Sequence, residues 1–262
     1  MLLFKRILNF KKETAPPGDK RQIQRHTVGH PFPFKAIVTL LDHDEDGKPI
    51  TKDERGQDWA GRLVNLSETG ASIQLHSAAV GHRGESCRFR LSLDKYVLDM
   101  PGTIAHFRTF PQYMLCGFSC AFPDFETQKA YLQLLEPVSI GAALAAVDTK
   151  KVRQDADGLR KEQFSGGAAS VLDVWRLVAN GEIHSFDFRM NDYGVRWSDG
   201  MTEVEPYGVT KASPSAKKTG APFVHLSESQ LEEVRWLFCL AVPNLARAVP
   251  SDIRKFLTKL VA

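Results

Sequence analysis

The chain of 262 residues lacks long apolar runs, a cysteine framework and a strong net charge. No stretch approaches the roughly 20 apolar residues that a membrane-spanning helix needs, and the charged first residues carry no small-residue cleavage site of a secretory signal. Four cysteines with no CxxC pair and no nearby histidine pair predict neither disulfides nor a metal site. A net charge of +3 is too small to indicate a nucleic-acid partner. We therefore expect a cytoplasmic, reduced protein without metal.

What is present indicates a globular chain with a basic start. The hydrophobic fraction is 43% and the charged fraction 25%, and the length suits two domains. Residues 1–35 carry eight lysines and arginines against two acids, which favours an anionic ligand or surface. Apolar residues in the first ten positions fall on one face of a helix, so a docking or membrane-surface helix is an alternative to a frayed terminus. Membrane contact is not expected.

Six short apolar runs dominate the N-terminal half. They alternate or are rich in β-branched and aromatic residues, and they cover residues 34–41, 59–66, 71–75, 88–93, 104–107 and 114–122. Asp124 is a plausible N-cap for one helix, which Pro137 is expected to end. Cys116 and Cys120, four apart in the last run, are expected to be small core residues. The pattern predicts a mainly β domain, a small antiparallel barrel with a helix at its end.

The C-terminal half has a different texture. Residues 148–167 are polar and end in Ser-Gly-Gly, so we expect a linker over 139–167. Beyond it we expect a helix over 168–179, strands over 183–190 and 194–197, a loop at 211–215, a helix from Ser227 through Leu240 interrupted at Pro243, and a last helix over 251–260. Ser227 and Gln230 form a capping box. We interpret residues 168–262 as a small α+β domain of unknown function, and they resemble no family.

Two motifs precede and interrupt the strand pattern. Arg21 and Arg25 form an RxxxR, and Asn65, Ser67 and Gly70 form an NxSxxG. In this order, and with a Gly-Phe pair in the last strand, they resemble the PilZ family, whose best-known ligand is the second messenger cyclic di-GMP. The resemblance implies a six-stranded antiparallel PilZ-type β-barrel plus a helix.

The residues themselves suit such a ligand. An arginine fork grips a phosphate or the O6/N7 edge of guanine, so Arg21 and Arg25 can act on one ligand, with Lys20 as an accessory cation. Asn65 and Ser67 are two apart in a strand and face the same side, where they offer amide and hydroxyl groups. Gly70 permits a tight turn and close approach of the ligand. The resemblance implies that the RxxxR arm wraps onto the barrel at the second motif.

The predicted organisation is therefore a basic, partly amphipathic arm over 1–19, a PilZ domain over 20–138, the linker over 139–167 and the α+β domain over 168–262. We expect a cyclic di-GMP effector, not an enzyme, with no cofactor. Ligand binding would fold a mobile arm onto the barrel and alter contact with an unidentified protein partner, through the arm or the C-terminal domain. The resemblance connects such effectors with motility, biofilm or exopolysaccharide control.

Several alternatives stay open. The RxxxR can be a solvated basic linker and the NxSxxG an ordinary Asx turn. The barrel can be a pilus-related adaptor that binds no nucleotide, and the C-terminal half an unrecognised enzyme. Asp42 to Asp53 fits a calcium-loop spacing without flanking helices, for which an acidic hairpin tip is the simpler explanation. Residues 189–194 faintly echo the NxSxxG segment and allow a degenerate second barrel. The histidines at 26, 30, 76, 82 and 106 have no ligand spacing, so surface or structural roles are expected.

Overall fold

The computed structural model describes residues 25–44, 46, 48, 56–94, 96–154, 157–167, 170–209, 223–224 and 226–261. The chain divides into two compact units, Met1–Glu136 and Pro137–Ala262. This division lies two residues before the predicted end of the first domain at 138. The predicted arm over 1–19, together with Lys20 and Arg21, lies outside the described residues.

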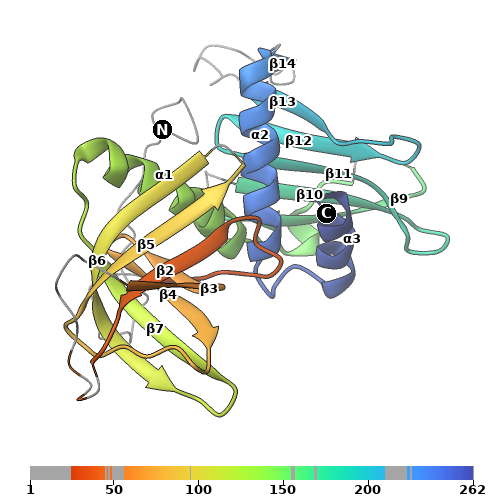
Figure 1. Cartoon of the computed structure of the whole chain (residues 1–262). Coiled ribbons are helices and arrows are strands. Elements are labelled where there is room, and N and C mark those ends of the chain that lie inside the picture. Colours follow the sequence, from red (N-terminus) through yellow and green to blue (C-terminus); the bar gives the residue numbers. More distant parts are fainter. Residues whose placement is uncertain are drawn as a thin grey trace. The chain divides into compact units, whose positions relative to one another are not determined.

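The N-terminal unit is a closed antiparallel barrel (Figure 1). Its described strands are β1 (Arg25–Thr27), β2 (Lys35–Leu41), β3 (Gly56–Ser67), β4 (Gly70–His76), β5 (Ser86–Leu93), β6 (Tyr96–Thr109) and β7 (Tyr113–Cys120). The order β3-β2-β5-β6-β7-β4 closes because the long β3 pairs with β2 through its first half and with β4 through its second half. β1 adds a short seventh strand beside the end of β3. The six predicted strands and the barrel are confirmed.

The barrel core follows from alternation along each strand. Every second side chain is buried in β2, in β5 and in β6 as far as Ile104, as expected where one face of a strand faces a closed interior. Cys116 is fully buried and Cys120 partly so, and all four cysteines are free. The largest fully buried side chains of the barrel include Leu40, Leu66, Ile73, Phe89, Leu91, Met100 and Ile104.

One long helix, α1 (Phe125–Ala142), follows the barrel. Its start is capped as predicted, because the Asp124 carboxylate accepts the backbone N–H of Thr127 at 2.6 Å. The expected end at Pro137 is wrong, since the helix continues for another turn beyond it. Proline is tolerated inside a helix where neighbouring packing offsets the lost hydrogen bond, and Val138 beside it is fully buried.

The C-terminal unit is built on one antiparallel sheet. Its strands are β8 (Ala145–Ala146), β9 (Leu159–Ser165), β10 (Ser170–Leu177), β11 (Ile183–Met190), β12 (Tyr193–Ser198), β13 (Glu205–Val209) and β14 (Phe223–Val224), paired in the order of the chain. This linear order differs from the barrel and gives no support to a degenerate second barrel. The α+β class and the strands at 183–190 and 194–197 are confirmed.

Residues 139–167 are not a linker, because they include the end of α1 and two strands of this sheet, β8 and β9. β8 and β9 pair with each other, and β9 pairs along its whole length with β10. The polar side chains that led to the linker prediction form ion pairs with side chains of the neighbouring strand, β10. Lys161 contacts Asp173 at 3.0 Å, and Glu162 contacts Arg176 at 3.2 Å.

The predicted helix over 168–179 is also wrong, because this segment holds β10. Its burial alternates with period two, with Leu172 and Val174 fully buried. Hydrogen bonding to β9 on one side and β11 on the other outweighs a weak local preference for helix. Gly181 has a φ of +76° in the turn between β10 and β11, a conformation that glycine adopts readily.

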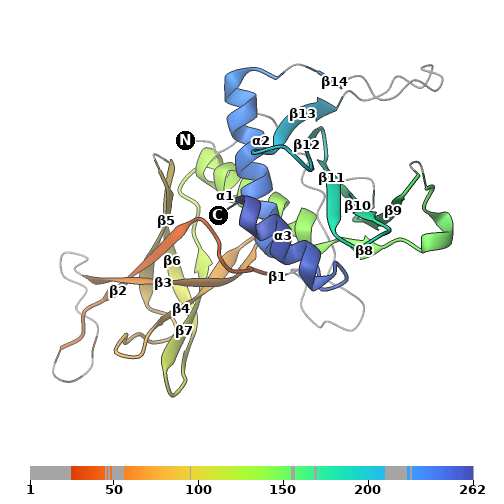
Figure 2. The ribbon, with the colours of Figure 1, turned by 90° about the vertical axis from the view of Figure 1, so that its right-hand side faces the viewer.

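Two helices, α2 (Glu228–Ala241) and α3 (Ser251–Val261), cover one face of the second sheet (Figure 2). The capping box at Ser227 and Gln230 is confirmed. Pro243 lies in a short 3-10 helix directly after α2, as its interruption of the pattern predicted. Phe186 of the sheet stacks on Phe238 of α2 and meets Phe256 of α3 edge-on, which fixes the core of this unit. Among the described residues, no helix is both long enough and apolar enough to span a membrane.

Candidate functional site

The pairing of β1 with β3 brings the two sequence motifs together. Arg25, the second arginine of the RxxxR, lies opposite Ser67, and Thr27 lies opposite Asn65. In these strands Arg25 is exposed and Ser67 is buried. The motifs are 40 residues apart in sequence but share one edge of the barrel, so one ligand can contact both.

A small hollow of about 50 Å³ lies at this edge. Its lining comes from β1, from the β3–β4 hairpin and from the facing parts of β6 and β7, and it consists of Arg25, Asn65, Ser67, Thr69, Gly70, Ala71, Ser72, Ala105, His106, Gly117, Phe118 and Ser119. The lining contains hydroxyl, amide, imidazole and guanidinium groups together with two glycines. Such a lining suits a polar, hydrogen-bonding ligand.

Two β-bulges shape the hollow. The β3–β4 register shifts between Leu63 and Asn65, and the β6–β7 register shifts between Ile104 and His106. A bulge turns the following side chain relative to the regular pleat and is common beside functional sites. Here the two bulges precede Asn65 and His106, and both of these residues line the hollow.

The β3–β4 turn is held from two sides through one carbonyl. The hydroxyl of Ser67 donates to the carbonyl oxygen of Gly70 at 3.0 Å, and the hydroxyl of the fully buried Tyr131 donates to the same oxygen at 2.8 Å. A Cβ on Gly70 would overlap the carbonyl of Phe118 in β7. Glycine is therefore needed here for close strand packing, and the turn is anchored on both β7 and α1.

The potential at the hollow is positive. Burial lowers the pKa of His106 below its usual range, and the nearby cations Arg108 and Arg25 lower the pKa further. In the described part of the chain, neither arginine forms a salt bridge with a carboxylate. The hollow thus presents the guanidinium group of Arg25 and the imidazole of His106 to an incoming anion, with Arg108 close enough to act on the imidazole.

The N-terminal unit matches the model of a known protein family. The family model of the PilZ domain matches residues 19–136, which is the N-terminal unit from the RxxxR to the middle of α1. Residues 19–136 are a PilZ domain. Among solved structures, the PilZ domain with c-di-GMP of YcgR from Escherichia coli is similar, with 11% identity and a TM-score of 0.32 over 44% of this chain and 88% of that chain. The search of curated proteins gives no match.

Within the PilZ domain, the structure gathers four of the six predicted ligand residues. Arg25, Asn65, Ser67 and Gly70 all line the hollow, while Arg21 and Lys20 fall outside the described residues. Sequence reasoning missed His106, which it treated as a surface or structural residue. A β-bulge and a register set by strand pairing place this side chain at the site, and neither leaves a clear trace in the sequence.

The calcium-loop hypothesis concerns a segment that is described only in part. Asp44 accepts the backbone N–H groups of Asp46 and Lys48 at 3.1 and 2.7 Å, so its carboxylate closes a turn of the β2–β3 connection. Asp53, the twelfth position of the pattern, lies outside the described residues. The turn is what an acidic hairpin tip requires.

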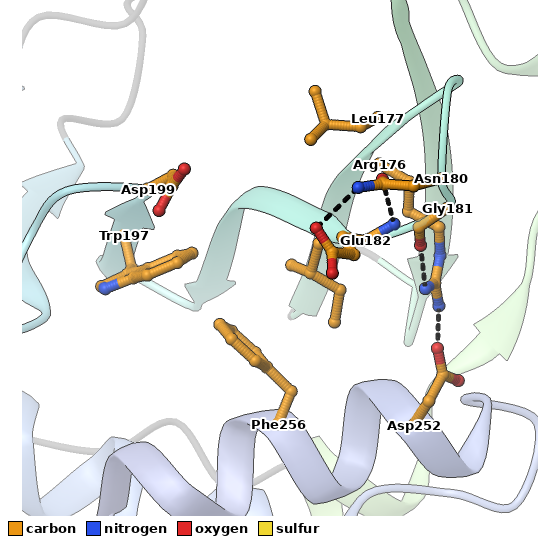
Figure 3. Close-up of a pocket in the computed structure, with 10 residues that line it drawn as sticks. Arg176, Leu177, Asn180, Gly181, Glu182, Trp197, Asp199, Asp252 and Phe256 are labelled. Carbon is orange, nitrogen blue, oxygen red and sulfur yellow. Dashed lines mark hydrogen bonds and ion pairs between the residues drawn. The ribbon is translucent and has the colours of Figure 1, made fainter.

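The C-terminal unit has a larger pocket of about 550 Å³ (Figure 3). It lies between the β10–β11 turn and α3, and the rings of Trp197 and Phe256 face it. Its most buried charge, Arg176, contacts Asp252 at 2.7 Å and donates to the carbonyl of Gly181 at 3.0 Å. With Glu162 also 3.2 Å away, the guanidinium is held in a structural ion-pair network. The charge of Arg176 is therefore engaged by structural partners, and the carboxylate of Glu182 likewise accepts from the amide of Asn180 at 2.7 Å.

Proposed function

We propose that this protein is a receptor for cyclic di-GMP that binds the nucleotide at the polar hollow of its PilZ domain. The observation that carries the proposal is the β1–β3 register, which sets Arg25 beside Ser67 and so joins the RxxxR to the NxSxxG. Arg21 and Lys20, just before β1 in the chain, would complete the cationic side of the site. No other group is required as a cofactor.

The chemistry of the ligand fits the groups present. Two phosphates call for guanidinium groups, which Arg25 provides in the described chain and Arg21 would add. Asn65 can pair with a guanine edge, and the hydroxyl of Thr69 is exposed beside it. Since the hollow holds only about 50 Å³, the nucleotide would lie across it and be gripped from above by the RxxxR segment.

Ligand binding would be transmitted along two routes. The RxxxR segment continues into residues 1–19, so fixing it on the barrel would change what this arm offers to a protein partner. The β3–β4 turn is bonded to Tyr131 of α1, and α1 continues into the C-terminal unit. A partner contact through the arm or the C-terminal unit would then depend on the nucleotide, in the cytoplasm and without catalysis.

Calorimetric titration of cyclic di-GMP into the full chain tests the proposal. We expect micromolar or tighter binding by the wild type and its loss in Arg21→Ala/Arg25→Ala. The matched control is Arg88→Ala/Arg90→Ala, which removes the same charge from β5 and is expected to bind like the wild type. Cyclic di-AMP, which has the same phosphates but no guanine edge, is expected to bind at least about tenfold more weakly.

The outcomes separate the candidate functions. Loss of binding in Arg21→Ala/Arg25→Ala alone supports a specific receptor. Equal loss in both double variants would mean a general charge effect and would contradict the assigned site. No binding by a folded wild type would overturn the receptor function and leave a nucleotide-independent adaptor, of the pilus-related kind, as the working hypothesis.

A further inference from the structure

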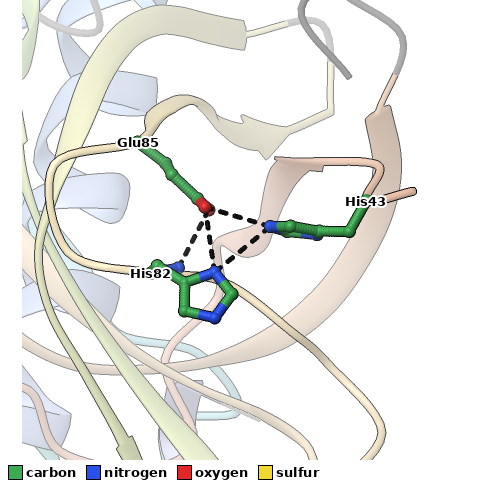
Figure 4. A group of neighbouring side chains, drawn as sticks. All are labelled: His43, His82 and Glu85. Carbon is green, nitrogen blue, oxygen red and sulfur yellow. Dashed lines mark hydrogen bonds and ion pairs between the residues drawn. The ribbon is translucent and has the colours of Figure 1, made fainter. Parts of the chain in front are cut away.

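A second cluster of polar side chains lies in the same unit but outside the hollow. His43 follows β2 by two residues, and His82 and Glu85 belong to the connection between β4 and β5 (Figure 4). The side chains of His43 and Glu85 are 12% and 10% exposed, while that of His82 is 59% exposed. His43 and Glu85 thus form a largely buried pair, and His82 forms the solvent-exposed side of the cluster.

The connection that carries two of the three groups is held in place by its backbone. Gly84 donates its N–H to the carbonyl of Ile104 at 2.8 Å, and Ile104 donates to the carbonyl of Glu85 at 2.9 Å. Gly84 has a φ of +93°, which glycine adopts readily. Glu85 Oε2 accepts the backbone N–H of His82 at 2.9 Å, and this leaves Oε1 directed at both imidazole rings.

Three ligand atoms form a nearly regular triangle. Glu85 Oε1 lies 3.0 Å from His43 Nε2 and 2.9 Å from His82 Nδ1, and the two nitrogens are 3.2 Å apart. In a tetrahedral zinc site with bonds of about 2.0 Å, neighbouring ligand atoms are about 3.3 Å apart. The observed triangle therefore needs to open by only a few tenths of an ångström to become one face of such a tetrahedron.

Hydrogen bonds alone do not satisfy this triangle. A neutral imidazole carries one ring proton and a carboxylate carries none, so at most two of the three edges can be hydrogen bonds. If both nitrogens donate to Glu85, their N–H groups lie side by side along the third edge. A cation that accepts one lone pair from each atom satisfies all three at once.

The donor set selects the kind of cation. Two imidazoles and one carboxylate suit zinc and similar first-row divalent ions, whereas calcium prefers oxygen ligands throughout. Both Cys87 and Cys116 are buried core residues that lie outside the cluster.

We propose that His43, His82 and Glu85 bind a divalent cation of the zinc class, with water at the exposed fourth position. The cation would join the end of β2 to the connection that enters β5. These two strands are neighbours in the barrel, so the site would close their ladder beyond the last paired residues, Leu40 and Cys87. The open side makes the metal exchangeable rather than permanently enclosed.

Metal titration of the untagged, chelator-treated full chain tests this site. We expect one equivalent of Zn²⁺ to bind and to raise the thermal unfolding midpoint, because the ion binds the folded state preferentially. His82→Gln, Glu85→Gln and His43→Gln are each expected to weaken binding at least about tenfold. The matched control is His76→Gln, an exposed histidine at the end of β4 that lies outside the cluster. Calcium is expected neither to bind nor to displace zinc.

His82→Gln is the decisive variant, since its side chain is mostly exposed and its loss leaves the fold intact. Zinc affinity that is the same in His82→Gln and in wild type would overturn the proposal. Co²⁺ provides a second test, because tetrahedral nitrogen and oxygen ligation gives visible absorption without the intense thiolate band. A thiolate band would assign the metal to cysteine and contradict the site.

Discussion

Glycine and a ring face each other across the strands in both units. Gly117 of β7 lies opposite His106 of β6, and Gly194 of β12 lies opposite Tyr207 of β13. At each glycine, a Cβ would overlap the ring on the neighbouring strand. The ring covers backbone that glycine leaves exposed, an arrangement that stabilises glycines in antiparallel sheets. At the first pair, the same arrangement holds the imidazole of His106 in the lining of the polar hollow.

The environment of His106 predicts how stability depends on pH. Its folded-state pKa is lowered by burial and by Arg108 and Arg25, so below about pH 6.5 the unfolded state binds a proton that the native state does not. The free energy of unfolding should therefore fall as the pH drops from 7 through 6.5, and level off below the folded-state pKa. Arg108→Ala is expected to raise this pKa and to reduce the pH dependence, measured by NMR titration of the His106 ring and by urea unfolding at several pH values.

Arg88→Ala is the control for that titration, because this arginine is paired with Asp99 on another strand. A pKa of His106 that is insensitive to Arg108→Ala would show that burial alone sets it. A pKa at or above the ordinary value would contradict the described packing of the ring.

Among the elements, α1 has the clearest link to the candidate site. Tyr131 is fully buried and donates to Gly70, while Tyr96 of the barrel donates to the carbonyl of Ala130 at 3.2 Å. These two bonds fasten the first half of the helix to β4 and β6. The helix is thus hydrogen-bonded directly to the turn that carries the NxSxxG motif.

Removing the Tyr131 hydroxyl should loosen this attachment without emptying the core. We expect Tyr131→Phe to lower the free energy of unfolding by about 1 kcal/mol, the usual net contribution of a buried hydrogen bond. Gly70 keeps its bond from Ser67, so its carbonyl is not left without a donor. Urea unfolding measures the change, and Tyr113→Phe, a partly exposed tyrosine stacked on Phe110, should change stability by less than about 0.5 kcal/mol. Equal effects of both variants would contradict this role.

On the scale of the whole molecule, two separate cores support two units. Phe89 is fully buried in the barrel, and Phe188 is fully buried beneath α2 in the second sheet, where it meets Phe238 edge-on. The four tryptophans divide unevenly, with Trp59 in the first unit and the other three in the second. Each unit therefore carries its own spectroscopic reporter.

Core truncations should act within their own unit. Phe89→Ala and Phe188→Ala are each expected to cost about 3–5 kcal/mol through lost burial and a new cavity. Fluorine NMR of fluorotryptophan-labelled protein in urea would follow both units at once, with Trp59→Phe assigning the barrel signal. We expect Phe89→Ala to shift the urea unfolding transition of the Trp59 signal most. Phe188→Ala is expected to shift most the transitions of the three tryptophan signals of the second unit. Equal shifts of all four signals would show that the chain unfolds as one cooperative body.

Much of this protein can be predicted from local sequence. Alternating apolar residues predicted the six barrel strands, and Asp124 and the Ser227–Gln230 capping box predicted two helix starts. Two short motifs indicated the family and a set of candidate ligand residues, four of which line the hollow. Each of these signals acts within a few residues, through side-chain direction or a capping hydrogen bond. These local signals could be interpreted without knowing which strand or helix packs against the segment.

The remaining features depend on partners far along the chain. β10 was predicted as a helix because the alternating burial of its side chains is evident only once β9 and β11 pair with it. β9 was predicted as part of a polar linker because the sequence does not show that Lys161 pairs with Asp173 on the neighbouring strand. His106 reaches the hollow through a bulge and a cross-strand register. His43, His82 and Glu85 meet only because β2 and β5 are neighbours in the barrel. The sequence by itself determined the barrel strand pattern and the two motifs. Strand pairing over long separations in the chain decided which other side chains lie beside them, because hydrogen-bonded register is a property of two segments and not of one.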